Sequence, residues 1–116
     1  MSRPIKFRQP VIRNGVFESW HYWGWMGAGN FVGPMGKNHS PDNGYQFTGL
    51  TDIDGNDIHE GDILAERHRE IVIMWEVTFH DGGFCVKQSQ LYADRASRLR
   101  IIGNTTENPE LIKELK

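Results

Sequence analysis

The sequence has one cysteine and no long apolar run, and both shortages narrow the class of protein. Cys85 cannot form an internal disulfide, so the reducing cytoplasm is the expected location. The start of the chain does not combine a charged segment and an apolar stretch in the manner of a secretory signal, and no segment is long and apolar enough for a membrane span. The sequence therefore predicts a cytoplasmic protein that makes no membrane contact.

Charge of one sign is missing from two stretches of the chain. Residues 38–66 contain seven acids and no Lys or Arg, whereas residues 1–13 carry four basic residues and no acid. The net charge of −2 gives no overall attraction to nucleic acid or to an anionic membrane. Either these stretches are solvated faces of a neutral protein, or an acidic patch on one copy meets a basic patch on another. A second basic group consists of Lys87, Arg95, Arg98 and Arg100, with Asp94 as its only acid.

Turn residues and apolar patterns predict the elements of structure. A length of 116 residues is typical of one domain, and thirteen glycines beside few Ala and Leu favour strands and tight turns. Asn14-Gly15 between two apolar runs predicts a type I′ hairpin over residues 5–17. Asn108-Pro109-Glu110 has the cap, proline and first-turn acid of a helix start. Further strands are expected near 45–50, 58–66, 70–80, 83–88 and 99–103.

These elements predict a single domain over residues 1–116 in the β-dominated α+β class. Its centre is expected to be a small, strongly bent five-stranded sheet or a closed barrel, with an N-terminal hairpin and a short C-terminal helix. On the strand that starts at Ile71, every odd position as far as Phe79 is apolar, which predicts a face wholly in the core. Residues 19–43 are rich in Trp and Gly without a regular period, so a long, partly packed loop is expected there.

The sequence contains no recognisable pattern of a catalytic or metal site. The acids around Asp52 resemble the start of a calcium loop, but Gly55 falls at the fourth position rather than the sixth, and Ile63 stands where a bidentate Glu is needed. The five histidines and one cysteine lack zinc spacing, and Cys85 has no nucleophile motif around it. We therefore predict polar turns in the acidic segment, and no catalytic residue, metal or cofactor.

The aromatic cluster between Trp20 and Trp25 is the most suggestive candidate for a binding surface. Aromatic rings stack on bases or sugars, and large apolar side chains anchor protein interfaces. The alternative is that these rings fill the core of a small domain. The candidate binding residues are Trp20, Trp23, Trp25, Arg95, Arg98 and Arg100.

Short motifs at both ends and in the middle of the chain form one pattern. They are Ile5–Arg8 (IKFR), Gln46–Leu50 (QFTGL), Asp52, Asp54-Gly55, Ile58, Glu60–Ile63 (EGDI), Ile101–Asn104 (IIGN) and Glu107–Leu111 (ENPEL). Together they resemble the YopX family, small proteins of phages and bacterial prophages. The resemblance implies a phage or prophage origin and a small five-stranded barrel flanked by further strands and helices. It implies no activity and no functional residues, and residues 9–43 depart from the family's pattern.

Three hypotheses for function follow. The first is a non-enzymatic protein-binding module in the cytoplasm of the bacterial host, either a homo-oligomer or the partner of a phage or host protein. The second is a nucleic-acid-binding small barrel that uses the three arginines and exposed Trp, although the net charge does not support it. The third is a small hydrolase or transferase, which would require a pocket that joins Cys85 or a histidine to a carboxylate.

Overall fold

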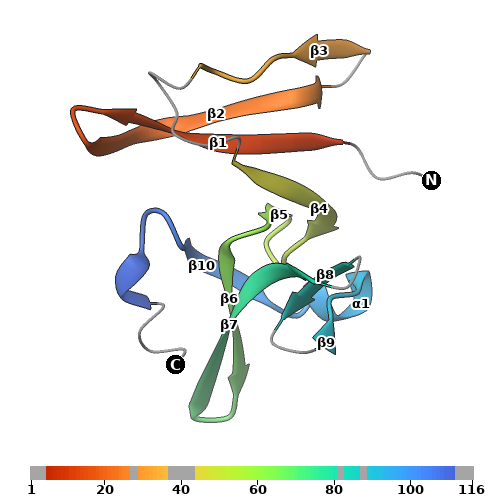
Figure 1. Ribbon diagram of the computed structural model, residues 1–116. Coiled ribbons are helices and arrows are strands. Elements are labelled where there is room, and N and C mark those ends of the chain that lie inside the picture. Colours follow the sequence, from red (N-terminus) through yellow and green to blue (C-terminus); the bar gives the residue numbers. More distant parts are fainter. Residues whose placement is uncertain (1–4, 27–28, 37–43, 81–82, 87–88, 112–116) are drawn as a thin grey trace. The chain divides into compact units, whose positions relative to one another are not determined.

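The computed structural model describes residues 5–26, 29–36, 44–80, 83–86 and 89–111 (Figure 1). The chain forms two compact units, unit 1 (Met1–Phe47) and unit 2 (Thr48–Lys116). Strands account for most of the described residues, as expected from the glycines and aromatic residues of the sequence. Each unit is described by itself.

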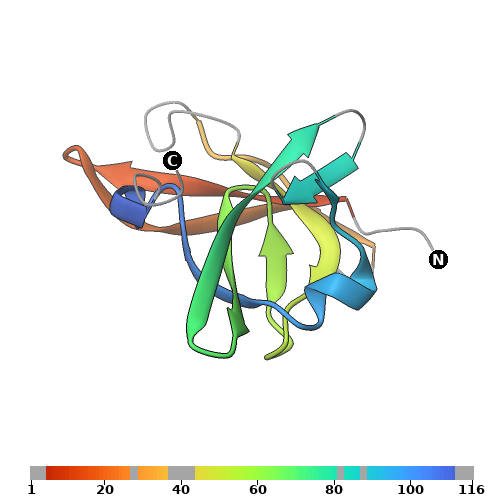
Figure 2. The ribbon, with the colours of Figure 1, turned by 90° about the horizontal axis from the view of Figure 1, so that it is seen from below.

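Unit 1 is built on a long antiparallel hairpin. Strands β1 (Lys6–Arg13) and β2 (Val16–Met26) pair from Lys6↔Gly24 to Arg13↔Val16, and they run side by side in Figures 1 and 2. The turn between them places Asn14 at φ 54° and Gly15 at φ 77°, the two positive angles of a type I′ turn. The predicted N-terminal hairpin is therefore confirmed. Outside it, β3 (Asn30–Val32) pairs with β2, and the start of β4 (Tyr45–Thr51) pairs with β1.

The prediction of a long loop over residues 19–43 is wrong where the structure describes this stretch as strand. Residues 19–26 continue β2, and β3 follows. The aromatic residues of β2 contact both faces of β1, because Trp23 packs on Phe7 whereas Trp20 packs on Arg8. A strand with large side chains on both faces lacks the alternation that identifies a strand in sequence. Residues 27–28 and 37–43 of the expected loop lie outside the described residues.

Unit 2 contains an antiparallel sheet in the order β10-β6-β7-β8-β9. Its consecutive strands β6, β7 and β8 form the predicted meander. Two small elements, β9 and α1, were not expected from the sequence pattern. The elements of unit 2 that follow β4 are β5 (Asp57–His59), β6 (Asp62–His68), β7 (Ile71–His80), β8 (Gly83–Val86), β9 (Ser89–Gln90), α1 (Ala93–Ala96) and β10 (Arg100–Asn104).

The core of unit 2 consists of aliphatic side chains and the Phe84 ring, which come from its strands and from the segment around α1. Half-buried Leu50, Trp75 and Ile101 pack against its margin. Burial of one such aliphatic side chain stabilises a fold by roughly 1.5–3 kcal/mol. The buried members are Ile58, Leu64, Val77, Phe84, Val86, Leu91, Ala96 and Leu99.

The expectation that one face of β7 lies wholly in the core is wrong at both ends of the strand. Val77 is buried and Trp75 half-buried, but Ile71, Ile73 and Phe79 are exposed. The first half of β7 pairs with β6 but lies beyond the ends of β8 and β10, because β8 pairs with β7 only from Val77 and β10 pairs with β6 only as far as Ala65. Alternation of side chains predicted the strand but could not predict how much of it would be covered.

The overall prediction of a β-dominated fold is confirmed, whereas its finer form differs. Two antiparallel sheets of five strands are present, the first in the order β3-β2-β1-β4-β5, in place of a single five-stranded sheet. The strand pairings of the described residues do not close into a barrel. The predicted C-terminal helix starts at Pro109 and is helical through Leu111, and residues 112–116 lie outside the described part of the chain.

Candidate functional site

The six residues predicted to form a binding surface are divided between the two units. The three tryptophans belong to unit 1, and the three arginines belong to unit 2. Within each unit, some of these side chains pack on the protein's own residues and others face solvent. Their individual contacts show which of them are available to a partner.

Trp20 and Trp23 are half-buried by neighbours in unit 1. The Trp23 ring stacks on Phe7, its partner in the β1–β2 pairing, with centroids 4.4 Å apart and an interplanar angle of 16°. The Arg8 guanidinium lies 4.3 Å from the centre of the Trp20 ring, a cation–π distance, and the edge of Tyr45 approaches the same ring at 6.1 Å. Trp20 and Trp23 therefore fit the alternative interpretation, in which the rings pack on the protein's own residues.

Gly24 allows β2 to lie close to the backbone of Ile5, next to the start of β1. Its φ of 111° is unfavourable for residues with a side chain, and a Cβ placed there would lie 2.6 Å from the Ile5 carbonyl oxygen. The next residue, Trp25, donates its backbone N–H to that same oxygen at 3.0 Å. Glycine thus allows the two strands to approach closely beside Trp25.

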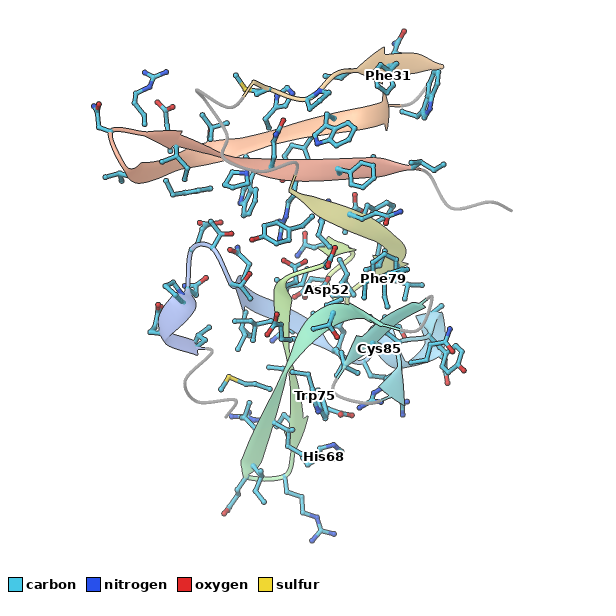
Figure 3. All side chains as sticks on the ribbon, viewed as in Figure 1. Phe31, Asp52, His68, Trp75, Phe79 and Cys85 are labelled. Atoms are coloured by element: carbon cyan, nitrogen blue, oxygen red, sulfur yellow. The ribbon has the colours of Figure 1, made fainter. Side chains whose placement is uncertain are left out.

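Trp25 is the tryptophan of this segment that faces solvent. It is 53% exposed, and its ring meets Phe31, 57% exposed, edge to face with centroids 5.3 Å apart. Phe31 lies in the middle of β3, the edge strand of its sheet, and all three residues of β3 are exposed. Sequence reasoning missed Phe31 and Val32 because it placed them in a loop. We call Trp25, Phe31 and Val32 the aromatic edge (Figure 3 labels Phe31).

Two of the three predicted arginines are engaged within unit 2. Arg95, at the end of α1, lies over the Trp75 ring with 4.8 Å between its guanidinium carbon and the ring centre. Arg100 Nε donates to Asp54 Oδ2 at 2.8 Å, and this hydrogen bond, with the charge of Asp54, raises the pKa of Arg100 above its ordinary value. Arg98 is exposed. The basic group therefore has less charge to offer an anionic partner than its sequence suggests.

The acidic signature between Asp52 and Asp62 has a structural role. Asp52 is 4% exposed, and its Oδ1 accepts the backbone N–H groups of Asp54 and Asn56 at 3.0 and 2.9 Å (Figure 3). Its Oδ2 accepts the N–H of Ile101 at 3.0 Å. Asp62 is also buried, and its Oδ2 accepts the N–H of His59 at 2.7 Å. Both carboxylates hold tight turns, the role predicted for this segment.

The C-terminal motif is held together in the same way. Oδ1 of buried Asn104 accepts the backbone N–H groups of Thr106 and Glu107 at 3.0 and 2.8 Å. Asn108 Oδ1 accepts the N–H of Asn104 at 3.2 Å, just before the helix that starts at Pro109. The central and C-terminal motifs of the family resemblance thus contain side chains that satisfy backbone donors.

The described residues include the one cysteine of the chain and several possible metal ligands. Cys85 is buried, and its Sγ donates to the Gly83 carbonyl oxygen at 3.8 Å. In this part of the chain, no three His, Cys, Asp or Glu side chains lie close enough to hold a metal ion. No helix formed by these residues has the length and apolar character to cross a membrane.

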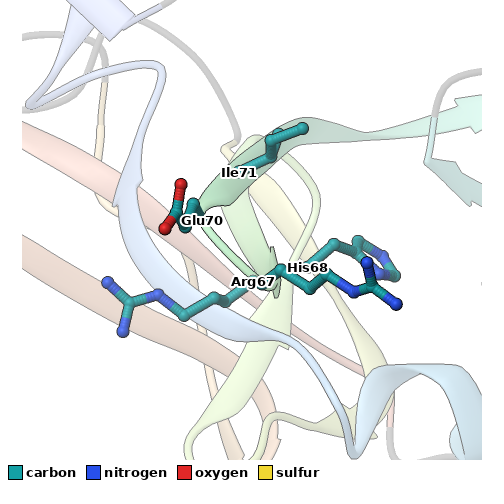
Figure 4. Close-up of a pocket in the computed structure, with 5 residues that line it drawn as sticks. Arg67, His68, Glu70 and Ile71 are labelled. Carbon is teal, nitrogen blue, oxygen red and sulfur yellow. The ribbon is translucent and has the colours of Figure 1, made fainter.

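One open hollow lies at the closed end of the β6–β7 hairpin. Five consecutive residues, from Arg67 to Ile71, line it, and Figure 4 shows Arg67 and His68 directed to opposite sides. His68 Nε2 lies 3.2 Å from Glu66 Oε1. Because a single turn of chain forms the hollow, it does not enclose a ligand.

Comparison with known proteins places the chain in a family. The family described as YopX protein matches residues 35–113, more than half of the chain. Among curated proteins no match is found. The crystal structure of protein EF1440 from Enterococcus faecalis is similar in fold, with a TM-score of 0.51 and 24% identity over 97% of this chain and 79% of that chain. The family match covers both the central and the C-terminal motifs, and the chain belongs to the YopX family.

Proposed function

We propose that this chain is a non-enzymatic protein-binding module of phage or prophage origin, which acts in the bacterial cytoplasm and self-associates through its aromatic edge. The observation that carries the proposal is the pair of exposed rings at Trp25 and Phe31. An isolated exposed apolar side chain needs no explanation, but these two rings touch each other and are followed by exposed Val32.

The chemistry of the aromatic edge suits a protein partner. Trp is enriched among the residues that dominate binding energy at protein interfaces. The strand that carries Phe31 is also a sheet edge, where unpaired backbone groups can accept a further strand. No residue of β3 is charged or proline, the two residue types that commonly blunt an edge. Ring burial and main-chain pairing therefore favour the same surface.

Sedimentation velocity over a range of protein and salt concentrations tests the self-association. We expect a reversible oligomer that persists at high salt, because apolar contacts are not screened. Phe31→Ser and Trp25→Ser should each weaken association tenfold or more. Val16→Ser is the matched control, because Val16 is an exposed apolar residue at the other end of β2. A chain that is monomeric at every concentration and ionic strength contradicts self-association.

A nucleic-acid function has weaker support. Arg95 and Arg100 are engaged by Trp75 and Asp54, and the net charge is −2. Phosphate contacts by several free Lys or Arg side chains supply most of non-specific affinity. An enzymatic function would need a nucleophile beside a base, and the buried Cys85 thiol does not favour such a site.

A further inference from the structure

The first half of β7 is an open edge on a projecting hairpin. In the sheet of unit 2, β7 lies between β6 and β8, but β8 pairs with it only from Val77 to His80. Over Ile71–Met74, the described residues place a strand on one side of β7 only, that of β6. Figure 1 shows the closed end of this hairpin extending away from α1, β8 and β10. We call residues 66–74 the arm.

The arm exposes aliphatic side chains on both of its faces. Ile71 is 65% exposed, Val72 53% and Ile73 38%. Successive residues of a strand point to opposite faces, so Ile71 and Ile73 share one face and Val72 lies on the other. Ile71–Trp75 contains no charged residue, glycine or proline. An uncharged, β-branched segment on an unpaired edge is a template for another strand.

Natural edge strands are usually protected by a lysine, a proline, a bulge or a covering element. The pairing of β6 with β7 runs without a bulge from Ile63↔Glu76 to His68↔Ile71, so the outer edge of β7 is regular. Its N–H and C=O groups can therefore bond to a second strand in register.

We propose that the arm pairs antiparallel with the arm of a second copy of this chain, through the outer edge of β7 over residues 71–74, and so joins two sheets into one. Antiparallel pairing about a two-fold axis is self-complementary, because each contact occurs twice. It brings Ile71, Val72 and Ile73 of one copy against the same three residues of the other, and no charge opposes a like charge in this stretch.

The charges that flank the apolar segment favour this partner. Exposed Arg67, Arg69 and Glu70 lie at the tip of the arm, and half-buried Glu76 lies at its base. In an antiparallel pair that sets Val72 opposite Val72 of the other copy, Arg69 lies close to Glu76 at both ends, and Glu70 lies opposite uncharged Met74. His68 is already accompanied by Glu66 on its own strand. A second copy thus pairs the backbone groups of the edge, covers its apolar side chains and places opposite charges beside Arg69 and Glu76.

This inference deepens the proposed self-association by assigning it a second surface, in unit 2, and it does not use the aromatic edge. Pairing through the arm slows hydrogen exchange of the outward N–H groups of residues 71–74, whereas association through the aromatic edge leaves exchange at these residues unchanged. The two surfaces can therefore be tested separately in the same protein.

The experiment compares sedimentation and hydrogen exchange of the full chain with those of Val72→Lys and Ile71→Lys. Lysine is tolerated on exposed edges, where it opposes pairing. We expect each variant to weaken the dimer tenfold or more, and the wild type to show exchange within residues 71–74 that slows as its concentration rises. Ile53→Lys is the matched control, because Ile53 is an exposed aliphatic residue elsewhere in unit 2. Circular dichroism of each variant checks that the fold is intact.

The outcomes separate the two surfaces. Dimers that survive Val72→Lys and Ile71→Lys but are lost in Phe31→Ser overturn the arm pairing and leave the aromatic edge as the interface. Dimers lost in the arm variants but retained in Phe31→Ser support the arm and remove the aromatic edge from self-association. Concentration-independent exchange across residues 71–74 in a dimeric wild type also overturns the arm pairing, as does a wild type that is monomeric at every concentration.

Discussion

The carboxylate of Asp52 accepts the backbone N–H of Ile101 at 3.0 Å, across 49 positions of the sequence. The neighbouring residue, Ile53, donates its N–H to the Leu99 carbonyl oxygen at 2.8 Å. These bonds fasten the turn after β4 to the start of β10. Two motifs that are distant in sequence therefore form one structural feature of unit 2.

Replacement of Asp52 by Ala should destabilise unit 2 strongly. The substitution leaves the N–H groups of Asp54, Asn56 and Ile101 without their acceptor at a buried position. An unsatisfied buried donor costs about 1–3 kcal/mol, so we expect a loss of roughly 3 kcal/mol or more in the free energy of unfolding. Urea denaturation followed by circular dichroism measures it, and an unchanged midpoint would show that water replaces the carboxylate at no cost.

Asp54→Ala provides the comparison within the same turn. Asp54 and Arg100 are both exposed, so solvent screens their ion pair and its loss should matter far less than the loss of Asp52. The pKa of Arg100 is raised, so the stabilisation by its charge is fully present below the ordinary pKa of arginine and is lost as the pH rises through the raised value. Titration of Arg100 therefore adds no pH dependence near neutrality. Equal losses in the two variants would contradict the distinction between them.

Gly103→Ala should weaken the C-terminal motif. A Cβ at position 103 would lie 2.5 Å from Asn108 Oδ1, and that oxygen accepts the N–H of Asn104. Relief of the clash breaks this hydrogen bond, which costs about 1 kcal/mol or more. Gly83→Ala is the control, because its nearest neighbour at 3.4 Å is the end of the Gln90 side chain. Thermal denaturation of both variants checks the expectation, which fails if their midpoints are equal.

The environment of Trp25 should change on self-association. It is the most exposed of the chain's four tryptophans, since Trp20, Trp23 and Trp75 are half-buried. Acrylamide quenching should therefore be strong at low protein concentration and should fall as oligomers form. Trp25→Phe should remove most of the quenchable emission. Quenching that stays constant while the sedimentation coefficient rises would place the interface away from Trp25.

Nucleic acid should bind weakly if at all. With Arg95 on Trp75 and Arg100 on Asp54, only Arg98 of the predicted trio has no assigned role in the described structure. Fluorescence anisotropy with labelled single- and double-stranded DNA and RNA at low salt, where phosphate contacts are strongest, should show no saturable binding. Tight binding that Arg98→Ala reduces would favour the nucleic-acid function instead.

Local signals in the sequence predicted the elements whose geometry is set by neighbouring residues. The Asn14-Gly15 turn, the acidic turn after Asp52 and the helix start at Pro109 are such cases. Each depends on side chains or φ angles within a few positions along the chain. Part of the family resemblance has the same origin, because Asp52, Asp54-Gly55 and Glu60–Asp62 form tight turns or hold them.

Features that depend on distant neighbours were missed. The aromatic strand β2 has no alternating pattern because Phe7 and Arg8, on opposite faces of β1, both receive rings. The partners of Arg95 and Arg100 lie 20 and 46 positions away, so the basic group looked unoccupied in sequence. The exposure of Ile71 follows from where β10 and β8 stop, which the residues of β7 do not encode.

The hydrogen bond between Asp52 and Ile101 also affects the order in which the two units fold during synthesis. The β1–β2 hairpin closes on a two-residue turn and can form soon after it leaves the ribosome. The sheet of unit 2 needs β10 beside β6, and Asp52 finds its last donor only after residue 101 has been synthesised. During elongation the strands of unit 2 stay uncovered until β10 has been synthesised. The nascent chain is therefore most open to aggregation before that point.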